Sequence, residues 1–168
     1  MSGAADPVAR FLENASKAAA GTLRVPGGAS GLAAALSGLF PAEAAVFCPG
    51  KTELEKAALR GIARRVPDYR DADVTVEEVA GGIAETGSLV CTSAGGRAVQ
   101  AGLLPAHHVA IVRTEAIFAT LDDFFAACVA APPPTNVTLV TGPSRTADIE
   151  LTLAIGVHGP GRLDILVV

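Results

Sequence analysis

Short apolar runs recur along the chain, and segments with helical periodicity separate most of them. Strand-like runs are predicted over residues 22–25, 44–50, 74–82, 83–93, 107–113, 136–142 and 162–168. Periodic apolar positions predict helices over residues 7–20, 29–40, 52–65, 116–131 and 146–156. Strands that alternate with helices form βαβ units with right-handed crossovers. We therefore expect an α/β fold, with one mostly parallel open sheet and helices on both of its faces.

The size and composition of the chain favour one compact core. A chain of 168 residues has the size of one ordinary domain, so we expect a single domain over residues 1–168. Half of the residues are hydrophobic but only 4% are aromatic, so small aliphatic side chains must fill the core. Buried strands covered by alanine-rich helices meet that requirement.

Charge and hydropathy narrow the classes of partner. The net charge is −4, and the arginines do not cluster with aromatic residues as nucleic-acid binding normally requires. The sequence lacks an apolar run of the roughly 18 residues that a membrane span needs, and its first residues do not resemble a signal peptide. We expect a cytoplasmic protein that binds no nucleic acid and does not insert into membranes.

The cysteine pattern argues against disulfides and against zinc or iron–sulfur ligation, because Cys48, Cys91 and Cys128 are odd in number and far apart. They are expected to be small hydrophobic residues of the interior. The motifs GxxxxGK[ST] for phosphate binding, GxGxxG after a strand for dinucleotide binding and GxSxG for a nucleophile elbow are missing. The sequence therefore predicts no metal and no cofactor in this chain.

The strongest local signal is the segment NVTLVTGPSRTADIE, in which an apolar strand runs directly into Gly142 and then into a predicted helix. In open parallel sheets, ligands bind at such a strand-to-helix edge. Gly142 allows a close turn, and Ser144 and Thr146 offer hydroxyl groups. Arg145 can pair with a carboxylate or a phosphate through its planar guanidinium. This loop is a candidate binding site for a small anionic group.

The same segment also has a purely structural interpretation. Ser144 or Thr146 can cap the predicted helix, while Asp148 and Glu150 in its first turns complement the helix dipole. On the pattern alone, this interpretation and ligand binding have equal weight.

Glu85 lies with Thr86, Gly87 and Ser88 between two apolar stretches. A carboxylate at such a position is costly unless it is solvated, paired or functional. Glu85 is therefore a candidate acid, base or ligand-orienting group, and pairing with Arg145 is one way to satisfy it. A structural salt bridge or a loop hydrogen bond explains it equally well.

His158 is the best of the three histidines for proton transfer or ligand binding, because glycines flank it in the segment GVHGP and Gly159 leaves room for a ligand. His107 and His108 begin an apolar strand and are less favoured. The alternative for His158 is an ordinary hydrogen-bonded loop residue.

Three segments, AETGSLV, LLPAHHVAIV and TGPSRTADIELTLAIGVHGPGRLDILVV, resemble successive motifs of the lactate-utilisation (LUD) domain family over about residues 74–168. Carried over one by one, the motif positions fall on Glu85, Thr86, Gly87, Ser88, Gly142, Pro143, Ser144, Arg145, Thr146, Asp148, Glu150, His158, Gly159 and Pro160. Glu85 stands where the family is expected often to have aspartate.

The resemblance implies a fold similar to that of phosphosugar isomerases, coenzyme A transferases and formyltetrahydrofolate cyclo-ligase, the NagB/RpiA/CoA transferase-like group. It also implies a role in the oxidation of L-lactate to pyruvate, together with partner proteins that carry iron–sulfur clusters. Because this chain has no flavin, nicotinamide or cluster motif of its own, electron transfer would belong to those partners.

Three functions follow from these observations. The first is an accessory component of lactate oxidation that binds a small anionic ligand near Arg145. The second is a free-standing enzyme of the coenzyme A transferase, isomerase or cyclo-ligase type, with Glu85 or Glu150 as acid, base or nucleophile. The third is a non-catalytic docking subunit for the iron–sulfur partners.

Overall fold

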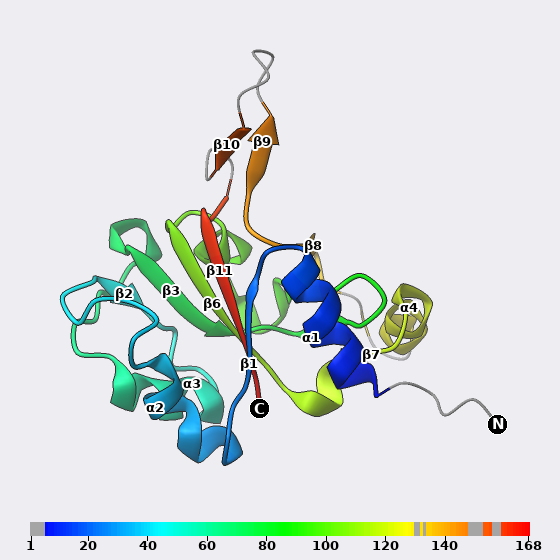
Figure 1. The fold of residues 1–168 in the computed structure, drawn as a ribbon, viewed down its shortest axis with the longest axis horizontal. Helices are drawn as coiled ribbons and strands as arrows, with labels where there is room; N and C mark the ends of the chain where they lie inside the picture. Colours follow the sequence, from blue (N-terminus) through cyan, green and yellow to red (C-terminus); the bar gives the residue numbers. More distant parts are fainter. Residues whose placement is uncertain (1–5, 130–131, 133, 148–152, 156–158) are drawn as a thin grey trace.

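A computed structural model describes residues 6–129, 132, 134–147, 153–155 and 159–168, and its largest sheet is parallel (Figure 1). The order of this five-stranded sheet is β1-β11-β6-β3-β2. Its strands are β1 (Gly21–Arg24), β2 (Val46–Phe47), β3 (Val74–Glu78), β6 (His107–Val112) and β11 (Arg162–Val167). The predicted α/β fold with a mostly parallel open sheet is confirmed.

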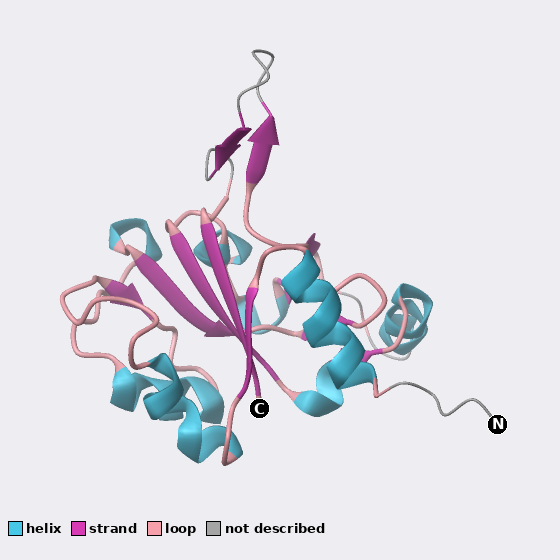
Figure 2. Cartoon of the chain, in the orientation of Figure 1, coloured by secondary structure: helices cyan, strands magenta, loops and turns pink. Residues whose placement is uncertain are grey.

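Helices cover both faces of the parallel sheet, as predicted (Figure 2). The helices are α1 (Pro7–Lys17), α2 (Leu32–Leu36), α3 (Glu53–Ala58) and α4 (Leu121–Val129). Helix α1 packs on one face, where Phe11 and Ile165 share a core, and α2 and α3 pack on the other, where Leu32 and Ile111 do. Side chains alternate between the faces of a strand, so Ala110 and Ile111 of β6 belong to different cores.

Local signals account for where the helices begin. Asp6 caps α1 by accepting a hydrogen bond from the Val8 amide, and Pro7 occupies the first turn, where its missing amide hydrogen is not needed. Single-turn 3-10 helices extend or connect the longer elements: η1 (Gly28–Gly31), η2 (Leu59–Gly61), η3 (Tyr69–Asp71), η4 (Ala94–Gly96), η5 (Val99–Gly102) and η6 (Thr114–Ala116).

Several helices are shorter than predicted. The segment predicted over 29–40 turns into extended backbone at Ser37, directly before Gly38 with its positive φ of 86°. The segment predicted over 116–131 begins only at Leu121, because Ile117 and Phe118 form a short strand that pairs with another strand.

A second, four-stranded sheet with the order β7-β4-β5-β8 was not predicted. Its strands are β4 (Gly81–Ile83), β5 (Ser88–Thr92), β7 (Ile117–Phe118) and β8 (Val137–Val140). β5 is antiparallel to both β4 and β8, while β4 and β7 are parallel. The turn between β4 and β5 is too short for a crossover helix, so these strands form a hairpin. Leu89 of β5 joins the core beneath α1.

The predicted helix over residues 146–156 is wrong wherever the structure describes it. β9 (Arg145–Ala147) and β10 (Leu153–Ile155) pair as antiparallel strands, and the hairpin projects from the body of the molecule (Figure 1). A segment that mixes polar and β-branched residues, such as RTADIELTLAI, fits a strand as well as a helix when packing does not decide.

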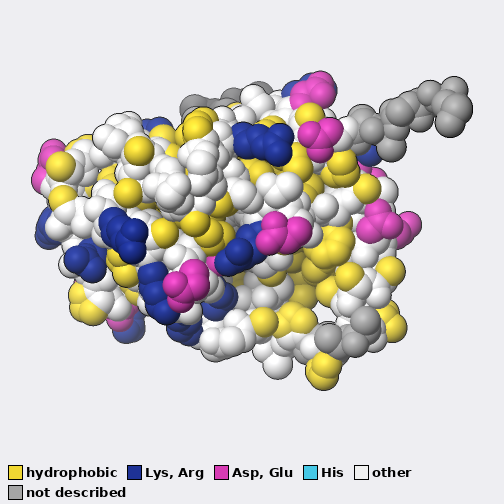
Figure 3. All heavy atoms as spheres, turned by 90° about the horizontal axis from the view of Figure 1, so that it is seen from below, with side chains coloured by type: hydrophobic (Ala, Val, Ile, Leu, Met, Phe, Trp, Pro, Cys, Tyr) yellow, Lys and Arg dark blue, Asp and Glu magenta, His cyan; other side chains and the backbone are white. Residues whose placement is uncertain are grey.

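Within the described part of the chain, no helix is long and apolar enough to cross a membrane. One face of the molecule shows basic and acidic side chains interspersed with hydrophobic atoms (Figure 3). Cys91 is buried, whereas Cys48 and Cys128 are half-buried, and all three are free thiols.

Candidate functional site

The loop from Gly142 to Arg145 lies against the residues that precede β11. The Ser144 amide donates a hydrogen bond of 2.8 Å to the carbonyl of Pro160, which fixes the two segments side by side. A pocket of about 300 Å³, here called the GPSR pocket, is lined by Gly142, Ser144 and Arg145 from the loop and by Gly159 from the other segment. The structure thus brings four predicted site residues to one pocket.

Gly142 makes this approach possible. Its φ is +72°, and a Cβ atom there would lie only 2.1 Å from the carbonyl oxygen of Ala18 at the end of α1. Only glycine fits a left-handed turn pressed against another backbone. The predicted close turn at Gly142 is confirmed.

A chain of hydroxyl groups joins the second predicted motif to the first. Thr86 Oγ1 lies 2.7 Å from Ser88 Oγ, which lies 2.6 Å from Thr141 Oγ1. Thr141 directly precedes Gly142, and Ser88 is buried while Thr86 is exposed. Gly87, with φ of +70°, packs its Cα against the backbone of Ala15. The turn between β4 and β5 is therefore coupled to the GPSR pocket through α1 and these hydroxyls.

Glu85 is exposed and lies at the start of a helix. Its Oε1 accepts a hydrogen bond of 2.7 Å from the amide of Leu121, the first residue of α4. This is the loop hydrogen bond considered as an alternative, in place of pairing with Arg145. A role for Glu85 as acid or base stays a prediction.

The remaining predicted site residues lie either in the β9–β10 hairpin or outside the described residues. Thr146 pairs with Ala154 in the β9–β10 hairpin, so the helix-capping role considered for Ser144 and Thr146 does not apply. Asp148, Glu150 and His158 lie outside the described residues.

Three side chains that were not predicted to form a site lie together at the edge where β6 and β11 begin. His107 Nε2 is 2.7 Å from Asp164 Oδ2, and Arg162 forms an ion pair with the same oxygen, with its Nε at 2.8 Å. Burial alone would raise the pKa of Asp164, but the hydrogen bond from His107 and the charge of Arg162 hold that pKa below its usual range. The available sequence signal was an aspartate among the apolar residues that follow Arg162 in the strand RLDILVV.

A third polar cluster has a structural role. Glu55 is fully buried in the first turn of α3 and accepts hydrogen bonds from the amides of Lys51, Thr52 and Glu78 and from the guanidinium of Arg97. It thereby ties α3 to the end of β3. In the residues that the structure describes, no group of three or more His, Cys, Asp or Glu side chains is placed to hold a metal ion.

Comparison with known protein families matches residues 63–168 to the LUD domain. The chain is similar to Lactate utilization protein C of Halalkalibacterium halodurans, with 31% identity over 110 residues, which is 62% of this chain and 48% of that protein. It is also similar to Lactate utilization protein C of Macrococcus caseolyticus, with 33% identity over 109 residues, or 62% of this chain and 46% of that protein. The chain spans about half the length of these curated relatives.

Comparison with solved structures gives a match over almost the whole chain. A DUF162 family protein from Deinococcus radiodurans superimposes with a TM-score of 0.70 at 23% sequence identity, covering 97% of this chain and 96% of that chain. At this level of identity the likeness concerns the fold. At 97% coverage it extends over most of the first 62 residues, which the family match does not cover but which contribute β1 and β2 to the parallel sheet.

Proposed function

This chain belongs to the LUD domain family, and on that premise we propose that it acts in L-lactate utilisation by binding a small anionic ligand in the GPSR pocket. Support comes from the relatives named Lactate utilization protein C, to which more than half of this chain is similar. The proposed ligand is lactate, pyruvate or a related carboxylate.

The observation that carries the proposal is the convergence of the family motif on one pocket. Gly142, Ser144 and Arg145 come from the loop after β8, and Gly159 comes from the segment before β11. Arg145 is exposed at this pocket, where its guanidinium can form two parallel hydrogen bonds with a carboxylate. The hydroxyls of Thr86 and Ser88 steady the loop through Thr141.

Oxidation of a 2-hydroxy acid needs an electron acceptor, and in this proposal the chain acts in the cytoplasm while partner proteins with iron–sulfur clusters accept the electrons. In this division of labour, the chain holds and orients the small acid while the partners move electrons. Glu85, Glu150 and His158 are the proposed acid–base groups. Asp148 completes the proposed set of ligand-binding residues.

Thermal unfolding with candidate ligands tests the proposal, because a ligand that binds only the folded state raises the unfolding midpoint. The ligands are lactate, pyruvate, phosphosugars, folates and acyl coenzyme A compounds. We expect lactate or pyruvate to raise the midpoint of the wild type and to have no effect on Arg145→Ala. Arg60→Ala removes another exposed arginine, on η2, and serves as the matched control that keeps the shift.

Other outcomes would decide against the proposal. A shift given only by an acyl coenzyme A compound or a phosphosugar would favour a free-standing enzyme. A shift that persists in Arg145→Ala would place the ligand outside the GPSR pocket. If no ligand shifts the midpoint, the docking-subunit function is favoured, and pull-down with the iron–sulfur partners is the next measurement.

A further inference from the structure

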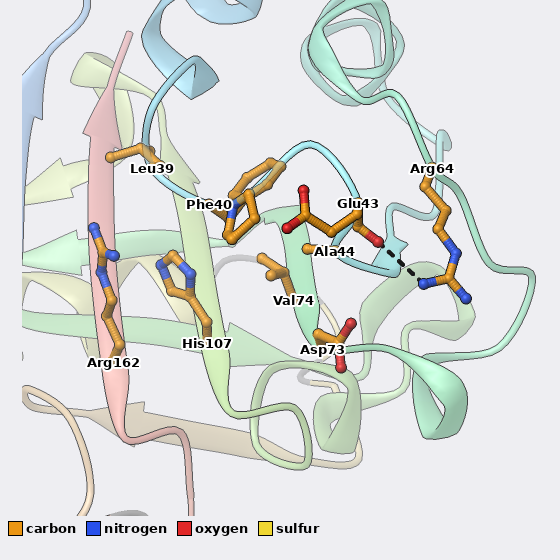
Figure 4. Close-up of a pocket in the computed structure, with 10 residues that line it drawn as sticks. Leu39, Phe40, Glu43, Ala44, Arg64, Asp73, Val74, His107 and Arg162 are labelled. Carbon is orange, nitrogen blue, oxygen red and sulfur yellow. Dashed lines mark hydrogen bonds between the residues drawn. The ribbon is translucent and has the colours of Figure 1, made fainter.

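A second pocket, larger than the GPSR pocket, lies where β3, β6 and β11 begin (Figure 4). Its volume is about 460 Å³, within the range of small-molecule sites. Leu39, Phe40, Pro41 and Val74 supply apolar walls, and His107 lies among them. We call it the His107 pocket.

The strand register brings three polar side chains together at one end of this pocket. β6 and β11 are parallel and place Arg162 beside His107, while Asp164 follows two residues along β11 on the same side of the strand. Gly21 of β1 is the partner of Asp164 on the other side. A Cβ at Gly21 would lie 2.0 Å from Asp164 Oδ1, so glycine there admits the carboxylate.

This arrangement fixes the hydrogen on the imidazole. A carboxylate only accepts hydrogen bonds, so Nε2 of a neutral His107 carries the hydrogen and donates it to Asp164. Nδ1 then presents a lone pair, to which none of the described residues donates a hydrogen bond. His107 is only 7% exposed, yet it lines the pocket. Nδ1 can therefore accept a hydrogen bond from a ligand that enters the pocket.

The charges in the pocket limit what that ligand can be. Figure 4 shows Arg162 and His107 at one end and Arg64 and Asp73 at the other, with Glu43 between them. The distant end is already satisfied by backbone, since Arg64 donates to the Glu43 carbonyl at 3.0 Å and Asp73 accepts from the Ala45 amide at 2.8 Å. When Asp164 is counted, the carboxylates outnumber the guanidiniums by one, so the pocket disfavours a dianion and stabilises a single carboxylate only beside Arg162.

We propose that the His107 pocket binds a 2-hydroxy acid with an apolar side chain. The carboxylate pairs with Arg162, whose side chain is 54% exposed and whose guanidinium has donors beyond Nε, the atom that faces Asp164. The hydroxyl donates to Nδ1 of His107, and the side chain lies against Phe40 and the neighbouring apolar walls. The volume is much larger than a three-carbon acid needs, which favours a ring or a branched chain. The site shares no residue with the GPSR pocket and does not depend on the proposed function.

Mandelate is the probe, because it combines a carboxylate, a neighbouring hydroxyl and an apolar ring. Phenylacetate, which lacks only the hydroxyl, is the matched ligand control. Long-range ¹H–¹⁵N NMR of the imidazoles, assigned through single histidine variants, should show a saturable change at Nδ1 of His107 with mandelate. We expect phenylacetate to bind about 3- to 10-fold more weakly, the value of one hydrogen bond.

Protein variants locate the binding. His107→Gln and Arg162→Leu should each lower the affinity for mandelate by about tenfold or more, as measured by titration calorimetry. Arg70→Leu is the matched control, because Arg70 also pairs with a nearby aspartate, Asp68, but outside the pocket. Ala44→Leu fills the pocket without touching the His107–Asp164 pair, so it tests the site even if the other variants unfold.

The outcomes separate this site from the other one. Arg145→Ala should leave mandelate binding unchanged, whether or not it abolishes lactate binding. Equal affinity for mandelate and phenylacetate would overturn the role of Nδ1. Binding that survives Ala44→Leu, or the absence of any change at His107 in the folded wild type, would overturn the site itself.

Discussion

Two glycines with positive φ angles show how much the surroundings of one residue matter. Gly142 has φ of +72° and faces the Ala18 carbonyl, whereas Gly95 has φ of +65° and no atom within 4 Å of where a Cβ would lie. We expect Gly95→Ala to lower the free energy of unfolding by about 1 kcal/mol, the cost of the left-handed region. Gly142→Ala adds a backbone clash and should cost about 3 kcal/mol or more. Urea denaturation of both variants checks this, and equal losses would contradict it.

Asp164 gives stability a dependence on pH. Its pKa is lowered in the folded protein, so its contribution is present above the ordinary carboxyl range and is lost as pH falls through the still lower folded value. We expect the difference in free energy of unfolding between wild type and Asp164→Asn to be constant above about pH 5 and to shrink below about pH 4. Urea titrations over this range measure it, and a difference that grows toward acid would have the wrong sign.

At the scale of residues, the sequence indicated site residues that are neighbours in the chain, but not side chains that pair across two strands. Gly142, Ser144 and Arg145 could be predicted as site residues because they are neighbours in one loop, where their residue types alone indicate anion binding. His107 was passed over in favour of His158, since its partner Asp164 is on a different strand. Only the register of β6 with β11 brings the two together, and a single sequence does not contain that register.

Among the elements, α3 depends on one buried carboxylate. Glu55 joins the first turn of α3 to the Glu78 amide and to Arg97, in addition to capping the helix with Thr52. Glu55→Ala leaves Arg97 and several amides without their partner, so we expect a loss of about 3–5 kcal/mol. Glu53→Ala on the same helix removes only an exposed pair with Lys56 and should change stability far less. Chemical denaturation compares them, and similar losses would contradict this role.

The elements themselves were predictable where local signals and packing agree. Asp6, Pro7 and the apolar spacing of α1 are consistent with the face that it buries, so its start was correct. The helix predicted over 146–156 was wrong because the local pattern fits both the helical and the strand period. The described strands β9 and β10 pair mainly with each other, so packing against the rest of the molecule does not decide between them. The second sheet was missed because its strands look like the parallel ones in sequence, while short turns decide their direction.

For the molecule as a whole, two thiols report on unfolding. Burial raises the pKa of Cys48 and the pKa of Cys91 to about 12, so both are neutral thiols at pH 8. We expect their reaction with a disulfide reagent to be slow in the native protein and to accelerate with urea in step with global unfolding. Single-cysteine variants separate these rates from that of half-buried Cys128. Rapid native labelling of Cys91 would contradict the prediction.

β11 lies between β1 and β6 in the parallel sheet, although its residues and those of β1 are near opposite ends of the described chain. Its pairing with β1 must close a loop of nearly the whole sequence, and the entropy lost in that closure opposes the pairing. Proteins dominated by such distant pairings fold on the slow side, in about milliseconds to seconds. Until β11 is in place, β1 and β6 expose unpaired edges to other chains. Self-association during refolding should therefore depend on how quickly this one strand inserts, and raising the protein concentration should lower the refolding yield.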